Sequence, residues 1–248
     1  MSTKVLAHRG FRSLYPENTL LAFQKALEIG AHGLELDIHY SKDGEIVVFH
    51  DFELERMTGQ SGSIYDFTYR ALSTMTLYQN NLKERIPSLK EVLELFSKFE
   101  REQPLSEPRI LNIEFKAGSQ FYPDIEERTL KLALNYLNKN QLIFSSFDHR
   151  ALVRLKELDA SVLTGALTTA LLIEPWLYLD RIHADFYHPH YLTLSGDHLK
   201  GLLMQEVKIN TYTLNDPQVA RQLIDQQINA IITDCPDKIL ALFDEEVV

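Results

Sequence analysis

The stretch G-L-E-L-D-I-H-Y-S-K-D-G-E-I-V-V-F-H-D, residues 33–51, decides the fold class. Its apolar runs at 33–39 and 46–50 predict two strands, and only a few residues centred on Asp43 and Gly44 separate them. A parallel crossover needs about a dozen residues or more. Asp-Gly between apolar runs is instead a strong hairpin signal. The second strand is therefore predicted to return antiparallel beside the first.

Further apolar runs alternate with helical patterns on both sides of this hairpin, as in strand-helix-strand units around a parallel sheet. Nine strands are predicted in all, at residues 4–8, 33–39, 46–50, 110–116, 142–146, 161–167, 184–188, 207–213 and 230–233. Without the hairpin arm eight parallel strands remain, and 248 residues is an ordinary length for a (β/α)8 barrel. We therefore predict a single TIM-barrel domain over residues 1–248, with an extra antiparallel hairpin arm after the second strand.

The helix signals between the strands agree with this architecture. Asn18 or Thr19 can begin one helix, and Ser88 followed by Glu91 forms a capping box ahead of another. The interval 52–87 is longer than an ordinary loop and is predicted to be a small insertion over the catalytic face of the barrel. Two roles remain as alternatives for this insertion, a structural cap and a lid that contacts the substrate.

Composition restricts the partners. The chain has 25 basic and 35 acidic side chains and a net charge of −10, so it offers no general attraction to nucleic acid or to an anionic membrane surface. The single cysteine, Cys235, excludes an internal disulfide. No apolar run has the length of a membrane span, and the N-terminus lacks the pattern of a signal peptide. We therefore expect a cytoplasmic protein without stable membrane insertion.

Glu35 and Asp37 are the first candidate site residues. Two positions apart on a strand, they point to the same face, while their apolar neighbours point to the other. Burying two like charges side by side is unfavourable unless a cation lies between them, and Mg²⁺ or Ca²⁺ suits carboxylate ligands. The alternative is a solvent-exposed edge strand with acidic outer residues.

The predicted hairpin register adds a histidine to this pair. A two-residue turn at Asp43 and Gly44 places Asp37 directly opposite His50. Opposed residues share one face with Cβ atoms about 5 Å apart, so His50 is expected beside the carboxylates. A purely structural histidine at a strand end is the alternative.

Two more strand ends carry polar groups. Glu114 and Lys116 share one strand face, and a barrel lysine beside acidic groups suits a substrate phosphate, although a simple surface ion pair is the alternative. His8, Arg9 and Gly10 end the first strand, where Arg9 offers a planar set of donors for phosphate and Gly10 allows a tight turn. Catalytic groups of such barrels collect at the carboxyl ends of the strands, where all of these residues fall.

The chain resembles the glycerophosphodiester phosphodiesterase family over nearly its whole length. No single motif carries the resemblance, which lies in the order and spacing of many. These are A-H-R-G at 7–10, P-E-N-T at 16–19, G-L-E-L-D-I at 33–38, D-G at 43–44, V-V-F-H-D at 47–51, E-F-K at 114–116, S-F at 146–147, T-Y-T-L-N at 211–215 and I-T-D-C-P-D at 232–237.

The resemblance implies one site built from these residues. Its members share the catalytic face, with a divalent metal held by Glu35, Asp37 and Glu114, proton transfer by His8 and His50, and phosphate binding by Arg9 and Lys116. It also implies that the insertion shapes the substrate pocket, and that Glu17 and Asn18 brace a loop near the site.

One residue departs from the family pattern. The family usually has tryptophan where Tyr212 stands, so an aromatic wall for the glycerol moiety is kept while its width and polarity change. Plain barrel packing is the alternative role for Tyr212. His183, His188 and His190 look like a metal-binding group by composition, but we expect them to be hydrogen-bonded structural residues.

The implied reaction is metal-dependent hydrolysis of a small glycerophosphodiester to sn-glycerol 3-phosphate and an alcohol, with the substrate's own 2-hydroxyl as nucleophile. One alternative is a lysophospholipase D or sphingomyelinase D-like enzyme, for which the apolar segment 171–179 could hold an acyl chain. A non-catalytic barrel that binds phosphate esters, and a metal-dependent aldolase or isomerase, are further alternatives. The alcohol released, the metal and the oligomeric state stay open.

Overall fold

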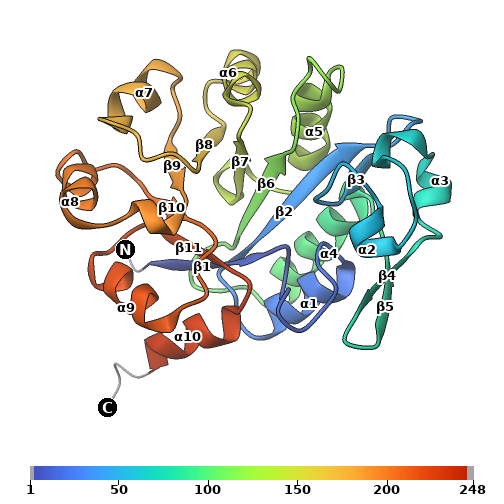
Figure 1. Ribbon diagram of the computed structural model, residues 1–248, viewed down its shortest axis with the longest axis horizontal. Helices are drawn as coiled ribbons and strands as arrows, with labels where there is room; N and C mark the ends of the chain where they lie inside the picture. Colours follow the sequence, from blue (N-terminus) through green and yellow to red (C-terminus); the bar gives the residue numbers. More distant parts are fainter. Residues whose placement is uncertain (1–2, 245–248) are drawn as a thin grey trace.

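The computed structural model describes residues 3–244 and contains eight parallel strands surrounded by helices (Figure 1). The strands are β1 (Lys4–His8), β2 (Gly33–Tyr40), β3 (Ile46–Val48), β4 (Thr76–Gln79), β5 (Leu82–Arg85), β6 (Ile110–Phe115), β7 (Leu142–Ser146), β8 (Leu163–Thr168), β9 (Phe186–Pro189), β10 (Asn210–Thr211) and β11 (Ala230–Thr233). The α-helices are α1 (Leu20–Glu28), α2 (Glu55–Thr58), α3 (Tyr69–Leu72), α4 (Leu89–Glu102), α5 (Ile125–Leu134), α6 (His149–Leu158), α7 (Pro175–Arg181), α8 (Gly196–Met204), α9 (Pro217–Asp225) and α10 (Pro236–Asp244). Short 3₁₀ turns lie at Ile64–Asp66, Lys139–Gln141 and Tyr191–Thr193.

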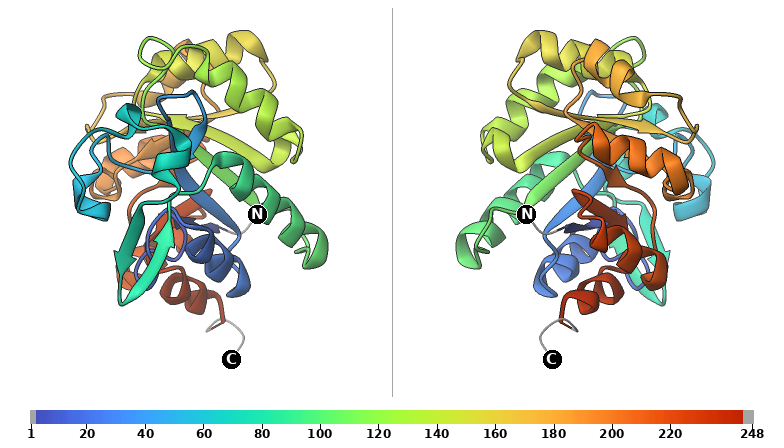
Figure 2. Two further views of the ribbon diagram at one scale, coloured as in Figure 1. Left: turned by 90° about the vertical axis from the view of Figure 1, so that its right-hand side faces the viewer. Right: turned by 90° about the vertical axis from the view of Figure 1, so that its left-hand side faces the viewer.

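The parallel strands follow the order β10-β11-β1-β2-β6-β7-β8-β9, and the ends of this path meet. Isolated parallel bridges from Tyr187 to Ile209 and from His190 to Tyr212 join β9 to β10 and complete the circle. Figure 2 shows from two sides that the helices enclose the strands. The predicted (β/α)8 barrel is confirmed.

Helices α1 and α4 begin where the sequence predicts them. The side chain of Thr19 accepts a hydrogen bond from the backbone amide of Ala22 at the start of α1, and Ser88 and Glu91 form the expected capping box of α4. Apolar helix faces, such as that of Val92 in α4, pack on the outer faces of the strands in one large core. In the described part of the chain, no helix combines the length and apolar character that a membrane span requires.

The hairpin arm exists, but its predicted register is wrong by one residue. Ile38 pairs with Val48, so Asp37 lies opposite Phe49, whose amide donates to the Asp37 carbonyl. The connection is a three-residue loop in which Gly44 has a positive φ of 76°, a common alternative to the two-residue turn. His50 lies beyond the paired residues, and its position is set by the loop that follows β3.

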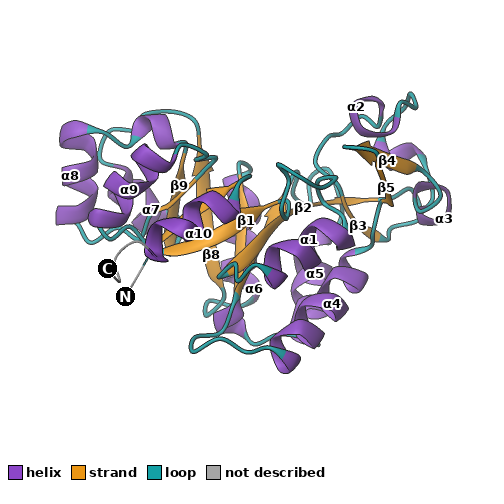
Figure 3. Ribbon diagram, turned by 90° about the horizontal axis from the view of Figure 1, so that it is seen from below, coloured by secondary structure: helices purple, strands orange, loops and turns teal. Residues whose placement is uncertain are grey.

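The insertion after β3 contains more regular structure than the sequence predicts. α2, α3 and an unpredicted hairpin of β4 and β5 gather beyond β3 at one end of the molecule (Figure 3). The β4–β5 turn consists of Asn80 and Asn81, both with positive φ, as this tight turn type requires. A second small apolar core, which includes Phe49, Leu54 and Ile64, joins the insertion to β3. The insertion is therefore anchored beside the mouth of the barrel.

Candidate active site

Parallel register brings the predicted site residues together at the carboxyl ends of β1, β2 and β6. His8 pairs with Glu35 across β1 and β2, and Asp37 pairs with Glu114 across β2 and β6. Paired residues of neighbouring parallel strands point to the same side, here into the mouth of the barrel. Lys116 follows directly after β6 and completes the set.

The three candidate metal ligands converge as the sequence predicts. Glu35, Asp37 and Glu114 are buried, and each offers a carboxylate oxygen within 4.8 Å of those of the other two. Burial and the charge of Asp37 raise the pKa of Glu35 well above its usual range. The same two causes raise the pKa of Glu114 to about 7, against the opposing effect of Lys116. The cluster holds more negative charge than its surroundings stabilise.

The neighbouring cations offset only part of this charge. Lys116 Nζ lies 2.6 Å from Glu114 and 3.4 Å from Asp37, and Arg9 Nε lies 3.2 Å from Asp37. Three carboxylates thus face two cations. In addition, Asp37 Oδ1 is buried and, although it faces Lys116 at 3.4 Å, it accepts no hydrogen bond in the described part of the chain. An all-oxygen, net negative, buried donor set fits a hard divalent cation.

His8 is oriented by a carboxylate from the opposite end of the chain. Its Nδ1 lies 2.6 Å from Asp234 Oδ1, and its Nε2 faces the carboxylate cluster, 3.9 Å from Glu35 Oε2. Burial lowers the pKa of His8 below its ordinary value, and the hydrogen bond with Asp234 opposes that shift. Asp234 thereby fixes the tautomer that carries the Nδ1 proton, which leaves Nε2 free to exchange one.

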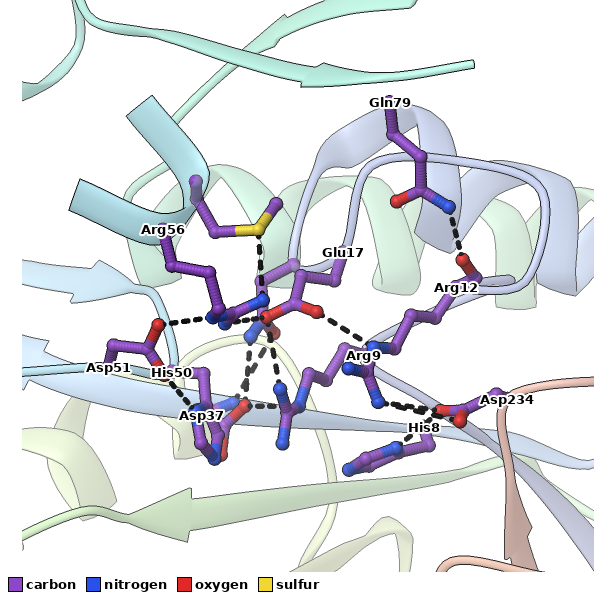
Figure 4. A network of polar contacts seen from close by, with 12 residues as sticks. His8, Arg9, Arg12, Glu17, Asp37, His50, Asp51, Arg56, Gln79 and Asp234 are labelled. Carbon is purple, nitrogen blue, oxygen red and sulfur yellow. Dashed lines mark hydrogen bonds and ion pairs between the residues drawn. The ribbon is translucent and has the colours of Figure 1, made fainter. Parts of the chain in front are cut away.

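His50 has the same kind of partner. Its Nδ1 lies 2.6 Å from Oδ1 of its neighbour Asp51, and its backbone carbonyl accepts a hydrogen bond from His39 Nε2. Burial lowers the pKa of His50, while the negative charge of Asp37 raises it. In Figure 4 the His50 ring lies beside Asp37, which agrees with the predicted proximity although the predicted register was wrong.

Arg9 is held in a strained backbone conformation. Its φ of 55° is unusual for a residue with a side chain, and such strain is often found at functional sites. Its backbone amide donates to Glu35, and its guanidinium donates to Glu17. The next residue, Gly10, has a φ of 81°, and a Cβ there would lie 2.6 Å from the backbone of Ala22 in α1. Only glycine allows this turn against the helix.

The loop of the P-E-N-T motif supports the site from behind. Asn18 donates a hydrogen bond of 2.8 Å to Asp37, and it also has a positive φ. Glu17 is buried and contacts Arg9, Arg12 and the insertion residue Arg56. Burial would raise the pKa of Glu17, but the hydrogen bond from Arg56 and the charges of the arginines lower it to about 2. Glu17 is therefore a buried anion surrounded by cations.

Sequence reasoning missed several of these residues. It assigned no role to Arg12, Asp51, Arg56 or Asp234, which form the polar network of Figure 4. The two aspartates stand inside quoted motifs, Asp51 in V-V-F-H-D and Asp234 in I-T-D-C-P-D. A carboxylate directly after a candidate histidine was a usable signal for Asp51, whereas the arginines carry no local signal.

Tyr212 lines the same cavity as His8, Glu35 and Glu114. Its hydroxyl donates to the carbonyl of Thr168, and its ring meets Phe147 edge to face at 6.0 Å. The tyrosine is therefore fixed by packing and also lines the cavity, an arrangement compatible with either predicted role.

The three histidines that look like a metal-binding group by composition do not converge. His188 is fully buried and receives a hydrogen bond from Asn210, while His190 Nδ1 caps the 3₁₀ turn after β9. His183 precedes β9 at the other end of the barrel. The contacts of His188 and His190 agree with the expected structural roles.

An open groove of about 610 Å³ is lined by His50 and Lys116 and by residues at the start of the insertion, among them Phe52 and Arg56. The site therefore has two spaces, the barrel cavity beside Tyr212 and this outer groove.

Comparison with known proteins agrees with the geometry. The profile of the Glycerophosphoryl diester phosphodiesterase family matches residues 8–238. A glycerophosphodiester phosphodiesterase of Caldanaerobacter subterraneus subsp. tengcongensis is 34% identical, with 98% of each chain covered, and one of Bacillus altitudinis is 32% identical, with 98% of this chain and 99% of the relative covered.

A solved structure extends the likeness to three dimensions. An Oleispira antarctica phosphodiesterase in complex with the product sn-glycerol-3-phosphate superimposes with a TM-score of 0.88 at 27% identity, covering 98% of this chain and 97% of the other. With the profile match and the two relatives, this likeness settles the family. The chain belongs to the glycerophosphoryl diester phosphodiesterase family and is a phosphodiester hydrolase.

Proposed function

We propose that this chain hydrolyses glycerophosphodiesters to sn-glycerol 3-phosphate and an alcohol in a metal-dependent reaction. The observation that carries the proposal is the convergence of three buried carboxylates with two histidines, each of which has a carboxylate at Nδ1. The Oleispira antarctica phosphodiesterase, similar over 98% of this chain, binds the same product.

Glu35, Asp37 and Glu114 are the proposed ligands of a divalent ion, Mg²⁺ or Ca²⁺. When bound, such an ion polarises phosphoryl oxygens and neutralises negative charge that develops on them. Its affinity depends on the ionised form of the carboxylates, so the raised pKa values of Glu35 and Glu114 predict stronger metal binding as the pH rises through neutrality.

His8 and His50 are the proposed proton carriers. One imidazole accepts the proton of the attacking hydroxyl, which is the glycerol 2-hydroxyl of the substrate, and the other gives a proton to the departing alcohol. A cyclic phosphate results, and water then opens it to glycerol 3-phosphate. The carboxylates at Nδ1 keep each ring in place and stabilise the imidazolium that forms.

Arg9 and Lys116 are the proposed phosphate ligands. Both now pair with site carboxylates, Arg9 with Asp37 and Lys116 with Glu114. Arg9 supplies a planar donor set and Lys116 a mobile ammonium group, which together suit the non-bridging oxygens of a diester.

The groove beside His50, with about 610 Å³, is the space that suits the departing alcohol, whereas the barrel cavity beside Tyr212, with about 20 Å³, holds little more than a water molecule. The groove is open, so alcohols of several sizes are expected to be accepted.

The decisive experiment is a product assay with glycerophosphocholine, glycerophosphoethanolamine and glycerophosphoglycerol. Release of glycerol 3-phosphate with Mg²⁺ or Ca²⁺, its loss with a chelator, and its return on adding metal would support the proposal. Equal turnover before and after chelation would refute metal dependence, and absence of product from every diester would refute the function.

A second candidate function, hydrolysis of lyso-lipids, has one observation in its favour. Exposed apolar side chains lie beyond the carboxyl ends of β8 and β9, where Leu171 is 63%, Ile173 92% and Leu192 70% exposed. An apolar rim at the mouth could hold an acyl chain. Turnover of lysophosphatidylcholine at a rate comparable to glycerophosphocholine would favour this function.

A further inference from the structure

Arg56 of α2 connects the insertion to the catalytic groups. Its Nε lies 2.5 Å from Asp51 Oδ2, and its Nη2 lies 2.6 Å from Glu17 Oε1 (Figure 4). One guanidinium therefore bridges two carboxylates that belong to different loops. Because its nitrogens are fixed in one plane, it also sets the separation of those carboxylates.

Each of these two carboxylates is linked by polar contacts to a proposed proton carrier. Asp51 uses Oδ2 for Arg56 and Oδ1 for His50 Nδ1, so both of its oxygens are engaged. On this side Arg56 is one residue removed from the imidazole.

The other side leads to the second histidine. Glu17 Oε2 accepts from Arg12 Nε at 2.7 Å, and Arg12 Nη1 lies 3.2 Å from Asp234 Oδ1. That same oxygen of Asp234 lies 2.6 Å from His8 Nδ1. An unbroken series of polar contacts thus joins His50 to His8 through Arg56.

We propose that Arg56 is a positioning residue, which the insertion contributes to the catalytic centre and which acts through Asp51 on His50. The proposal rests on the proton-transfer role proposed for His50. It gives the insertion a task beyond covering the barrel mouth, because α2 carries the one side chain that holds Asp51 against Glu17 in the described structure.

An ordinary surface ion pair would not serve this purpose. Exposed pairs contribute little because water and salt screen them. Glu17, however, has a side chain only 5% exposed, and Asp51 is held from both of its oxygens. The Leu54 side chain that precedes α2 is fully buried in the small second core, which fixes the base of the helix.

The test uses Arg56→Met and Arg56→Lys with glycerophosphocholine as substrate. We expect Arg56→Met to lower kcat by roughly 10- to 100-fold with KM changed by less than about 3-fold, as for other residues that orient a reacting group. Arg56→Lys keeps the charge beside Glu17 but has no rigid pair of donors, so it is expected to recover only part of kcat. The matched control is Arg85→Met, because Arg85 lies in the same insertion, pairs with Glu91 and has a side chain 43% exposed against 44% for Arg56.

A double-mutant cycle separates positioning from a general structural effect. If Arg56 acts through His50, Arg56→Met should lower kcat by less than about 3-fold in a His50→Ala background. The same 10- to 100-fold loss in that background would overturn the proposal, and so would wild-type kcat in both Arg56 variants or an equal loss in Arg85→Met.

Failure of the proposal differs from failure of the proposed function. If wild-type protein releases no glycerol 3-phosphate from any diester, the function itself is wrong. If wild type is active and His50→Ala is not impaired, the proposed target of Arg56 is wrong, and the inference falls with it. Thermal unfolding identifies any variant that does not fold. If Arg56→Met does not fold, Arg56→Lys decides the test instead, because its loss of kcat must likewise appear only where His50 is present.

Discussion

Histidines on two sides of the barrel mouth have opposite environments. In the charged sector, at the ends of β1 and β3, His8 and His50 each place Nδ1 2.6 Å from a carboxylate. In the uncharged sector, at β9, His188 is fully buried, and its Nδ1 has no hydrogen-bond partner among the residues that the structure describes. Burial lowers the pKa of His188 to about 3.

The difference distinguishes the two proposed proton carriers from a histidine held inside the barrel. All three rings are desolvated, but only His8 and His50 have an anion that stabilises the imidazolium form. His188 has the amide of Asn210 instead and stays neutral. Carboxylate partners therefore distinguish His8 and His50 from His188, whereas burial does not.

The largest effect is expected when a histidine of the charged sector is replaced. Replacing His8 or His50 by alanine should lower kcat by about 10² to 10⁴-fold, the usual contribution of a positioned proton donor or acceptor. Steady-state kinetics with glycerophosphocholine measure this loss. Wild-type kcat in either variant would remove that histidine from the mechanism.

A smaller effect is expected when only the carboxylate partners are neutralised. Asp51→Asn and Asp234→Asn keep the shape of the site but remove the anion at Nδ1, and we expect kcat to fall about 10- to 100-fold. Each should be milder than the loss of its histidine. A carboxylate variant as impaired as the alanine variant would mean that the anion, not the ring, dominates.

In the uncharged sector, the expected effect is on the pH dependence of the free energy of unfolding. Because the pKa of His188 is near 3 when folded and about 6.5 when unfolded, only the unfolded chain gains this proton as the pH falls below 6.5. Stability is lost in that window, and His188 accounts for about 2 kcal/mol between pH 7.5 and 5. His188→Gln should reduce the pH dependence of the free energy of unfolding by that amount, measured by urea denaturation at both values. An unchanged dependence would contradict the neutral assignment.

The smallest effect is expected at the exposed rim of the uncharged sector. Ile173→Ser should change the free energy of unfolding by less than about 0.5 kcal/mol and leave turnover of glycerophosphocholine unaltered. The same variant tested with lysophosphatidylcholine sharpens the comparison, since a selective loss there would assign the rim to acyl-chain binding.

The sequence predicted the parts of this molecule that depend on local pattern. β7 and β11 have the predicted bounds, and the alternation along β2 placed Glu35 and Asp37 on one face. The hairpin register was wrong because loop length, three residues instead of two, decides which residues pair. The β4–β5 hairpin was missed although Asn80 and Asn81 are typical of its turn.

The polar network could not be predicted, because its members come from distant segments. Arg12 follows β1, Arg56 lies in the insertion, and Asp234 follows β11, 222 residues after Arg12. Each residue alone resembles an ordinary surface charge. Only the folded arrangement shows that they meet around Glu17.

The junction of β9 and β10 gives the barrel a seam. β10 has two residues, and the junction consists of isolated bridges, whereas β2 and β6 pair along six positions. Local opening should start where the fewest ladder contacts must break, so amide hydrogens of 207–212 are expected to exchange with deuterium before those of β2. The seam includes Tyr212, which lines the same cavity as Glu35 and Glu114, so local opening there would loosen one wall of that cavity while β2 and β6 keep the opposite wall in shape.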